Sequence, residues 1–537
     1  MKRKELEMEK KDKSVFLLNK KIFWPILIVM ALIIALSFIN QEGFATVIGA
    51  LVNNEVKGFK WYVGPIVLFM FITQVVMLVS PMGRIKLGGK DAKAKFNTFS
   101  YWGLCICSSI AIGIVFYGVA QPLEFFMDPY ESWGVEAGSA AAAVKAIAQT
   151  NLEWAWGQYA AYGIYAMAIG VAMYNFAQPA RVSSLLYLVN GKPANSKLCL
   201  AVDIICVFGI ICGVSCSLGA GTMQMAAGLN TVFGISVNRL LWLIVEIVVV
   251  AGFLLMSVGG IAKGIKIVTD RNLELYIVIL IVVCAFGPTL YIFDMFTEST
   301  GVTFGTMIQS ITYTGGIDGN DRAINWQIWQ YVSCECFAPI TGLFFAKISY
   351  GRSLKEVVAG TMVIPAVFTA FWFTAFGSYA FDLQTSGALD VWAKFQELGM
   401  EATMFEVFKT LPGGIIWCAI FLVVIYISFV TLASSATTSA AYVTTITTRP
   451  ISEDEEPPMW IKCTWGAIMA ASAFIFISFA GINGAKSIAN IGGMPAVLLG
   501  GVSAYCVWQI SKRCLGKDGE QLPVVNATAI EGNASEE

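Results

Sequence analysis

The sequence contains no histidine among its 537 residues, and only 13% of its residues carry a charge. Histidine is the side chain that most often acts as a general acid or base in enzymes. Acid–base chemistry would have to rest on carboxylates alone, so we predict that the protein is not an enzyme. The formal net charge is −1 and no basic stripe runs along the chain, so we also predict no nucleic-acid partner.

The cysteines do not follow the pattern of a disulfide framework or of a metal site. All thirteen lie almost wholly within apolar stretches, whereas disulfide-stapled proteins are typically small and secreted. Two C-x-C pairs, Cys105/Cys107 and Cys334/Cys336, have the residue types of metal ligands. Residues i and i+2 point about 200° apart on a helix, and no histidine can complete such a site. We therefore predict no metal and no cofactor.

Apolar residues, by contrast, are abundant: they make up 57% of the chain, and the mean hydropathy is +0.69. A run of about 20 apolar residues is long enough for a helix to cross the hydrocarbon core of a bilayer. Such runs predict an all-α membrane protein with twelve transmembrane helices, at residues 22–39, 61–80, 101–120, 155–177, 199–218, 236–257, 274–294, 326–348, 356–380, 411–433, 460–481 and 487–511.

The basic residues predict the orientation of these helices, because cytoplasmic segments retain Lys and Arg. If the N-terminus is inside, the segments on its side of the membrane hold 27 of the 35 basic residues. We therefore predict a multi-pass protein of the plasma membrane with both termini in the cytoplasm. The N-terminal tail is charged and has no small-residue cleavage site, so we expect the first span to be retained.

Two longer hydrophilic stretches, 121–153 and 295–325, are predicted to lie outside. The second contains Phe296–Tyr313, in which Phe296, Phe304, Met307, Ile308 and Ile311 fall mostly on one side of a helix. This pattern predicts an amphipathic helix along the membrane surface, with a loose coil as the alternative.

Small-residue runs interrupt the third, fifth and tenth spans, at residues 108–113, 217–221 and 430–435. Backbone freed from helix hydrogen bonds can line a cavity and bind a solute or an ion. Close helix packing is the other interpretation of such runs.

Aromatic residues at the start of the fourth span have the spacing of a cage. At 3.6 residues per turn, Trp154, Tyr159 and Tyr162 fall within about 140° of one helix face. Aromatic faces bind cations, above all quaternary ammonium groups. Ordinary packing and an interfacial aromatic belt are the alternatives.

Several motifs together resemble those of the betaine/carnitine/choline transporter family, over about residues 20–510. The matching segments are Phe116–Leu123 (FYGVAQPL), Ser217–Gln224 with Gly228–Ile235 (GLNTVFGI), and Phe337–Pro339 through Ala346–Arg352 (AKISYGR). The resemblance implies two inverted five-helix repeats, spans 3–7 and 8–12, preceded by two extra helices. It also implies a homotrimer and alternating-access transport of a small cationic or zwitterionic solute.

This resemblance divides the chain into six parts. They are a cytoplasmic N-terminal tail (1–21), two extra transmembrane helices (22–80), the first repeat (98–294), an extracytoplasmic amphipathic helix and loop (295–325), the second repeat (326–511) and a short cytoplasmic C-terminal tail (512–537).

The resemblance also implies a substrate site between the fourth and eighth spans. The fourth-span residues Trp154, Tyr159 and Tyr162 match the family's aromatic box, with Tyr159 in place of its middle Trp. In the eighth span the family's Trp-Trp pair is replaced by Ser333-Cys334. The expected substrate-binding residues are Trp154, Tyr159, Tyr162, Trp329, Tyr331, Cys334, Glu335 and Phe337.

Glu335 sits in the middle third of its span, where a carboxylate normally faces a cavity or a partner. Our hypothesis is that it compensates for the lost aromatics by binding the substrate's ammonium. A structural carboxylate is the alternative, and Glu153 is a second candidate at the outer end.

The ion site that the resemblance implies is altered in this chain. The resemblance implies that sodium-driven relatives bind sodium with the backbone of the third span and a Thr-Ser pair in the tenth. In this chain the pair is Thr431-Leu432. Leucine offers no hard oxygen for sodium, unless Ser434 or Ser435 takes its place. The candidates for ion coupling are Ser109, Ile110, Thr431, Ser434, Ser435 and Arg271. Arg271 would replace the ion as a fixed cation in an exchanger; the alternative is a solvated side chain.

From these features we expect a secondary transporter of quaternary ammonium or methylated amine solutes such as glycine betaine, carnitine or choline. Sodium-independent exchange or proton-linked transport is favoured over sodium symport. A carrier of the same fold that uses Glu335 to bind another amino-acid-like cation is the alternative. A channel is disfavoured, because no repeated polar pore segment is present.

Overall fold

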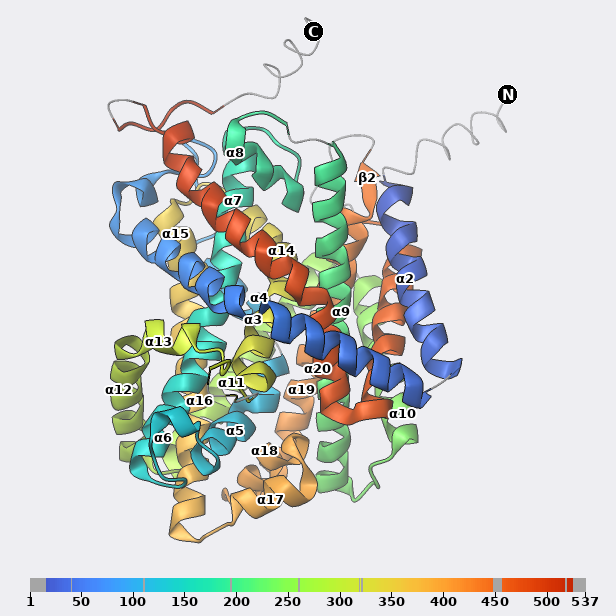
Figure 1. Cartoon of the computed structure of the whole chain (residues 1–537), viewed down its shortest axis with the longest axis vertical. Coiled ribbons are helices and arrows are strands. Elements are labelled where there is room, and N and C mark those ends of the chain that lie inside the picture. The colour runs from blue at the N-terminus through green and yellow to red at the C-terminus, as the bar shows by residue number, and fades with distance from the viewer. Residues whose placement is uncertain are drawn as a thin grey trace, which may run out of the picture.

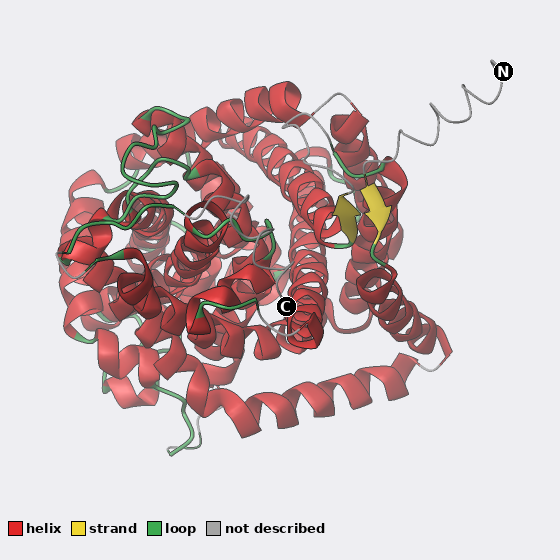
Figure 2. Cartoon of the chain, turned by 90° about the horizontal axis from the view of Figure 1, so that it is seen from above, coloured by secondary structure: helices red, strands yellow, loops and turns green. Residues whose placement is uncertain are grey.

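The computed structural model describes residues 16–39, 41–109, 112–193, 196–258, 261–317, 319, 322–447, 456–516 and 519–524. These residues are helical apart from loops and one small antiparallel sheet (Figure 2). The sheet pairs β1 (Phe16–Leu18) with β2 (Thr445–Thr447), with Leu17 opposite Ile446. It ties the start of the first helix to the segment that follows α19.

The long helices form one bundle, drawn in Figure 1. They are α2 (Lys20–Ile39), α3 (Gln41–Val79), α4 (Thr98–Ser109), α5 (Ile112–Met127), α6 (Ala140–Asn151), α7 (Gln158–Asn175), α9 (Ser196–Phe233), α10 (Arg239–Val258), α11 (Ile261–Phe286), α12 (Thr289–Gly305), α14 (Trp329–Ile348), α16 (Ile364–Ser386), α18 (Met400–Lys409), α19 (Gly414–Val443) and α20 (Met459–Cys514).

Shorter helical elements connect these helices. They are η1 (Pro81–Arg84), η2 (Glu131–Trp133), η3 (Leu152–Gly157), η4 (Val182–Leu186), α8 (Tyr187–Asn190), α13 (Met307–Thr312), η5 (Ile324–Ile328), α15 (Leu354–Val358), η6 (Ala359–Val363) and α17 (Val391–Leu398). Three of them, η3, η5 and η6, are π-helical turns that run directly into α7, α14 and α16.

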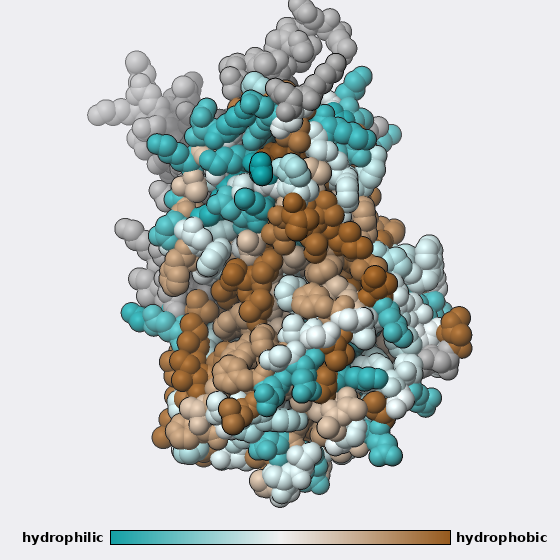
Figure 3. Space-filling view, turned by 90° about the vertical axis from the view of Figure 1, so that its left-hand side faces the viewer, coloured by the Kyte–Doolittle hydropathy of each residue, from teal (hydrophilic) through white to brown (hydrophobic). Residues whose placement is uncertain are grey.

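Within the described residues, seven helices are long and apolar enough to cross a membrane, or eight if a bent pair counts as one span. Apolar side chains gather over the middle of the molecule, and hydrophilic ones cover its upper end (Figure 3). Helix also covers most of each of the twelve predicted spans. The predicted spans 460–481 and 487–511 both belong to α20, which is broken at Ala480 and Gly481.

The predicted span 274–294 differs from the structure. Helix α11 ends at Phe286, and the chain bends by 110° before α12 begins at Thr289. Gly287 and Pro288 occupy the bend, and proline both restricts the residue before it and lacks the N–H that a continuing helix needs.

The stretch predicted as one amphipathic helix forms the end of α12 and all of α13, separated at Thr306. Met307 and Ile311 are buried, whereas Phe304 and Ile308 are exposed. The apolar residues of this stretch therefore do not share one buried face, because the break at Thr306 rotates α13 relative to α12.

Segments predicted to lie on the side of the termini meet at one end of the molecule. The Leu87 N–H donates to the Arg352 carbonyl, Gln521 Nε2 donates to the Lys86 carbonyl at 2.7 Å, and Arg513 Nε donates to the Leu188 carbonyl at 2.6 Å. In Figure 1, β2 and the last turns of α20 both lie at the upper end. The first and last described elements are thus on the same side of the bundle.

Candidate functional site

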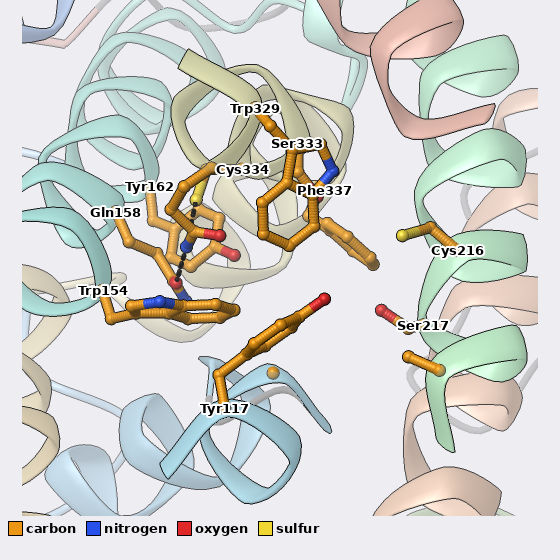
Figure 4. Close-up of a pocket in the computed structure, with 13 residues that line it drawn as sticks. Tyr117, Trp154, Gln158, Tyr162, Cys216, Ser217, Trp329, Ser333, Cys334 and Phe337 are labelled. Atoms are coloured by element: carbon orange, nitrogen blue, oxygen red, sulfur yellow. Dashed lines mark hydrogen bonds between the residues drawn. The ribbon is translucent and has the colours of Figure 1, made fainter. Parts of the chain in front are cut away.

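A pocket in the middle of the bundle is bordered by helices from distant parts of the sequence. Its walls come from α5, from η3 and α7, from α9, and from α14. The lining residues are Gly113, Tyr117, Trp154, Gln158, Tyr162, Cys216, Ser217, Ala220, Trp329, Gln330, Ser333, Cys334 and Phe337. Figure 4 shows Trp154 and Tyr117 on one side, the α14 residues on another, and Cys216 and Ser217 on α9.

The π-helical turn η3 decides which fourth-span residues reach this pocket. Trp154, Gln158 and Tyr162 all line it, and their i, i+4, i+8 spacing makes one stripe on a helix. A π-turn holds one more residue than an α-turn, so it rotates Trp154 toward the side of Tyr162. Gly113 gives the Trp154 ring its space, because a Cβ there would overlap the indole.

Three aromatic rings from three helices form the core of the pocket wall. The ring centroids of Tyr117 and Trp154 lie 5.1 Å apart, those of Tyr117 and Trp329 lie 5.5 Å apart, and those of Trp154 and Trp329 lie 6.3 Å apart. All three side chains are buried. A desolvated cation within about 6 Å of such rings gains roughly 2 kcal/mol or more per site.

Polar side chains also line the pocket. Gln330 Nε2 on α14 donates to Gln158 Oε1 at 3.0 Å and contacts Cys334 Sγ at 3.3 Å (Figure 4). The hydroxyls of Ser217 and Ser333 belong to the same lining. These groups supply hydrogen-bond donors and acceptors for a polar end of a ligand, while the rings bind an apolar or cationic end.

The Trp154 indole is oriented by a buried hydrogen-bonded chain. Its Nε1 donates to Gln121 Oε1 at 2.5 Å, and Gln121 Nε2 donates to Glu153 Oε2 at 2.5 Å. Gln149 Nε2 donates to the other oxygen of Glu153 at 2.8 Å. Glu153 therefore lies behind the pocket wall and positions Trp154 through Gln121.

Comparison with known proteins identifies the family. The profile of BCCT, the betaine/carnitine/choline family transporter, matches residues 21–514. The chain belongs to this family.

Relatives across most of the chain carry transporter names. The glycine betaine transporter OpuD of Bacillus subtilis is 29% identical over 88% of this chain and 91% of its own length. The ectoine/hydroxyectoine transporter of Virgibacillus pantothenticus is 26% identical over 90% of this chain and 94% of its own length. A glycine betaine transporter of Acinetobacter baylyi is 25% identical over 89% of this chain and 71% of its own length.

The family and the membrane-length helices together make this chain a multi-pass membrane transporter. The prediction of a role other than catalysis agrees with the transporter names of its relatives. Among the described residues, no three His, Cys, Asp or Glu side chains group as ligands for a metal.

The structure brings five of the eight predicted substrate residues into the transporter's pocket: Trp154, Tyr162, Trp329, Cys334 and Phe337. The other three lie outside its lining. The Tyr159 hydroxyl pairs with Thr369 Oγ1 at 3.1 Å. Tyr331 packs against the backbone of Gly157, where a Cβ would lie 2.5 Å from its ring.

Glu335, the third of these residues, is buried on another face of α14. Tyr165 on α7 donates to its Oε2 at 3.1 Å. Gly500 on α20 packs against its other oxygen, which a Cβ at position 500 would approach to 2.8 Å. Cys334 and Glu335 are neighbours in sequence, and residues one apart on a helix point about 100° apart, so Cys334 faces the pocket and Glu335 does not.

Three of the ion-coupling candidates bond within their own helices in the described part of the chain. Ser109, Thr431 and Ser435 each donate to a carbonyl of their own helix, at 2.6, 2.7 and 2.9 Å. Ser434 is buried and Ser435 is exposed. Arg271 is also exposed and pairs with Glu274 at 2.6 Å, as a solvated side chain would. Ile110 lies outside the described residues.

Sequence reasoning did not include several pocket residues among the site candidates. Tyr117 was available as the second residue of the FYG motif, and Gln158 lies midway between Trp154 and Tyr162. On α9, Ser217 opens the small-residue run of the fifth span and Cys216 precedes it. That run predicted a cavity lining, but the tertiary structure alone brings it together with the aromatic residues.

Proposed function

We propose that the transporter carries solutes with a quaternary or methylated ammonium head across the plasma membrane, by alternating access around the aromatic pocket. The three-ring wall of Tyr117, Trp154 and Trp329 is the observation that carries the proposal. Such solutes keep little hydration and bind to aromatic faces. The glycine betaine transporters among its relatives support the same class of solute.

The proposed architecture has twelve transmembrane helices, with spans 3–7 and 8–12 as inverted repeats, in a homotrimer with both termini in the cytoplasm. An even number of crossings is supported by the position of β1, β2 and the end of α20 at one end of the bundle. The cytoplasmic assignment of that end is supported by its excess of Lys and Arg.

For coupling, we propose sodium-independent exchange or proton-linked transport. Two features support this proposal. Leu432 stands where a sodium site would need a hydroxyl, and the hydroxyls of Ser109 and Thr431 donate to backbone carbonyls of their own helices. Sodium symport is the alternative and requires Ser434 or Ser435 to complete the ion site.

A carrier of another amino-acid-like cation is the second candidate function. Ser333 and Cys334 support it, because they leave the α14 wall less aromatic and more polar. The position of Glu335 favours the first proposal, since its carboxylate contacts Tyr165 and α20 rather than the pocket.

Uptake into proteoliposomes tests both the solute class and the coupling. Labelled glycine betaine is offered with and without an imposed sodium gradient, and carnitine, choline, proline betaine and trimethylamine compete. Competable uptake that needs no sodium supports the whole proposal, whereas uptake that requires sodium overturns the coupling part. Absence of uptake and exchange for every methylated solute overturns the solute class.

A further inference from the structure

The buried ammonium group of Lys486 lies against the aromatic wall of the pocket. Lys486 belongs to α20, five residues after the break at Gly481, and is 8% exposed. Its Nζ lies 3.9 Å from the ring centroid of Trp326, 4.5 Å from that of Trp329 and 5.7 Å from that of Tyr117. These three rings form a cage around the ammonium.

The ammonium retains unused hydrogen-bonding capacity. Lys486 Nζ donates to the Asn325 carbonyl at 3.1 Å, and an ammonium has three N–H donors. Within the described part of the chain no carboxylate forms an ion pair with it; the carboxylate of Glu124 instead accepts from Trp326 Nε1 and pairs with Arg322. Glu124 and Glu153 attract the ammonium without pairing with it. A buried charge without a direct ion pair is costly, so its presence beside a pocket points to a role toward the ligand.

The lysine cage and the pocket share two rings. Trp329 and Tyr117 line the pocket and also contact Lys486. A solute cation bound over Trp329 would lie within about 6 Å of that ring, and therefore within roughly 10 Å of Nζ. At an effective dielectric constant of about 20, two unit charges at this separation change an affinity by about tenfold.

We propose that Lys486 makes the pocket select zwitterionic solutes, which carry both a methylated ammonium and a carboxylate, over solutes of net charge +1. This inference rests on the proposed function of the pocket. The fixed ammonium repels a solute that is only cationic. The carboxylate of a zwitterion offsets that repulsion by its own attraction to the ammonium.

Binding of two solutes to purified protein tests this selectivity. Glycine betaine and choline share the trimethylammonium head, and choline has a hydroxyl in place of the carboxylate. Dissociation constants are measured by tryptophan fluorescence for the wild type, Lys486→Gln and Lys486→Arg. Lys347→Gln is the matched control, because Lys347 lies near the C-terminal end of α14 with its Nζ 4.6 Å from the Tyr442 ring centroid.

The wild type is expected to bind glycine betaine at least about tenfold more tightly than choline, and Lys486→Gln is expected to remove most of that preference. Lys486→Arg and Lys347→Gln should both retain it. A folded Lys486→Gln variant with the wild-type preference overturns the inference.

A measurement on the wild type alone keeps the inference falsifiable if Lys486→Gln does not fold. The methyl ester of glycine betaine retains the ammonium and loses the carboxylate, so it should bind about tenfold more weakly than glycine betaine. Equal binding overturns the selectivity and leaves the proposed function intact. Absence of binding for glycine betaine, choline and the ester together overturns the proposed function and this inference with it.

Discussion

Glu335 and Lys486 are both ionisable residues buried within the helical bundle, but their surroundings differ. Glu335 on α14 is enclosed by tightly packed helices, with Tyr165 on one oxygen and the backbone of Gly500 against the other. Lys486 on α20 lies among three aromatic rings, two of which, Tyr117 and Trp329, also line the pocket. A buried charge therefore does not mark a binding site by burial alone; what matters is whether the groups around it also border a cavity.

The largest expected effect comes from removing an aromatic face of the pocket. Trp154→Leu keeps an apolar side chain but loses the π-face, so affinity for glycine betaine should fall by about 30-fold, the equivalent of about 2 kcal/mol. Trp154→Phe should retain most of it. Trp156→Leu is the control, because Trp156 lies in the same π-turn but packs against Phe304 and Phe71. Equal losses in the Trp154 and Trp156 variants would contradict the assignment of the pocket.

The second largest loss of affinity for glycine betaine is expected from adding a methyl group at Gly113, in the wall of the pocket. In Gly113→Ala the new Cβ would overlap the Trp154 ring, which must move. We expect affinity for glycine betaine to fall roughly fivefold or more, since the displaced ring loses part of its cation–π attraction. Calorimetric titration of the purified variant measures this loss, and unchanged affinity would show that Trp154 does not contact the solute.

The same kind of substitution on the Glu335 side should reduce stability and leave binding intact. In Gly500→Ala the Cβ would lie 2.8 Å from Glu335 Oε1 and 3.0 Å from Met70 Sδ. Overpacking of this kind costs about 1–3 kcal/mol, so the Tm should fall. Gly501→Ala is the matched control, because its Cβ would meet Ile66 at an ordinary 3.5 Å. A Tm equal to that of Gly501→Ala would contradict the close packing around Glu335.

The smallest effect is expected from Glu335→Gln. Glutamine keeps an oxygen that accepts from the Tyr165 hydroxyl, so the affinity for glycine betaine should stay within about twofold of the wild type, or about 0.4 kcal/mol. A tenfold loss of affinity at an unchanged Tm would instead support Glu335 as a ligand and revive the alternative substrate.

Much of the helical layout was predictable from hydropathy, because a bilayer requires long apolar runs and leaves few other ways to satisfy the backbone. Helix covers most of every predicted span, including the two joined in α20. The extent of α11 was not predictable from hydropathy alone, because the bend at Gly287 and Pro288 lies inside an apolar stretch.

The candidate site was predictable in part. Trp154, Tyr162, Trp329, Cys334 and Phe337 were expected and line the pocket. Tyr159 was expected on the same face, but regular helix spacing does not account for the π-turn η3 that precedes it. Lys486 falls between the predicted spans 460–481 and 487–511, so the sequence placed it in a short outer connection.

The amino-acid sequence by itself determined that this protein is helical, belongs in a membrane and carries aromatic residues suited to a cation, because composition and motif depend on local residues. Only the tertiary structure decided which of those residues share a cavity, that Glu335 faces α20, and that Lys486 lies behind Trp329. The reason is geometric. Side chains one position apart on a helix point about 100° apart, so a single π-turn or helix break, together with the packing of distant helices, determines what each one meets.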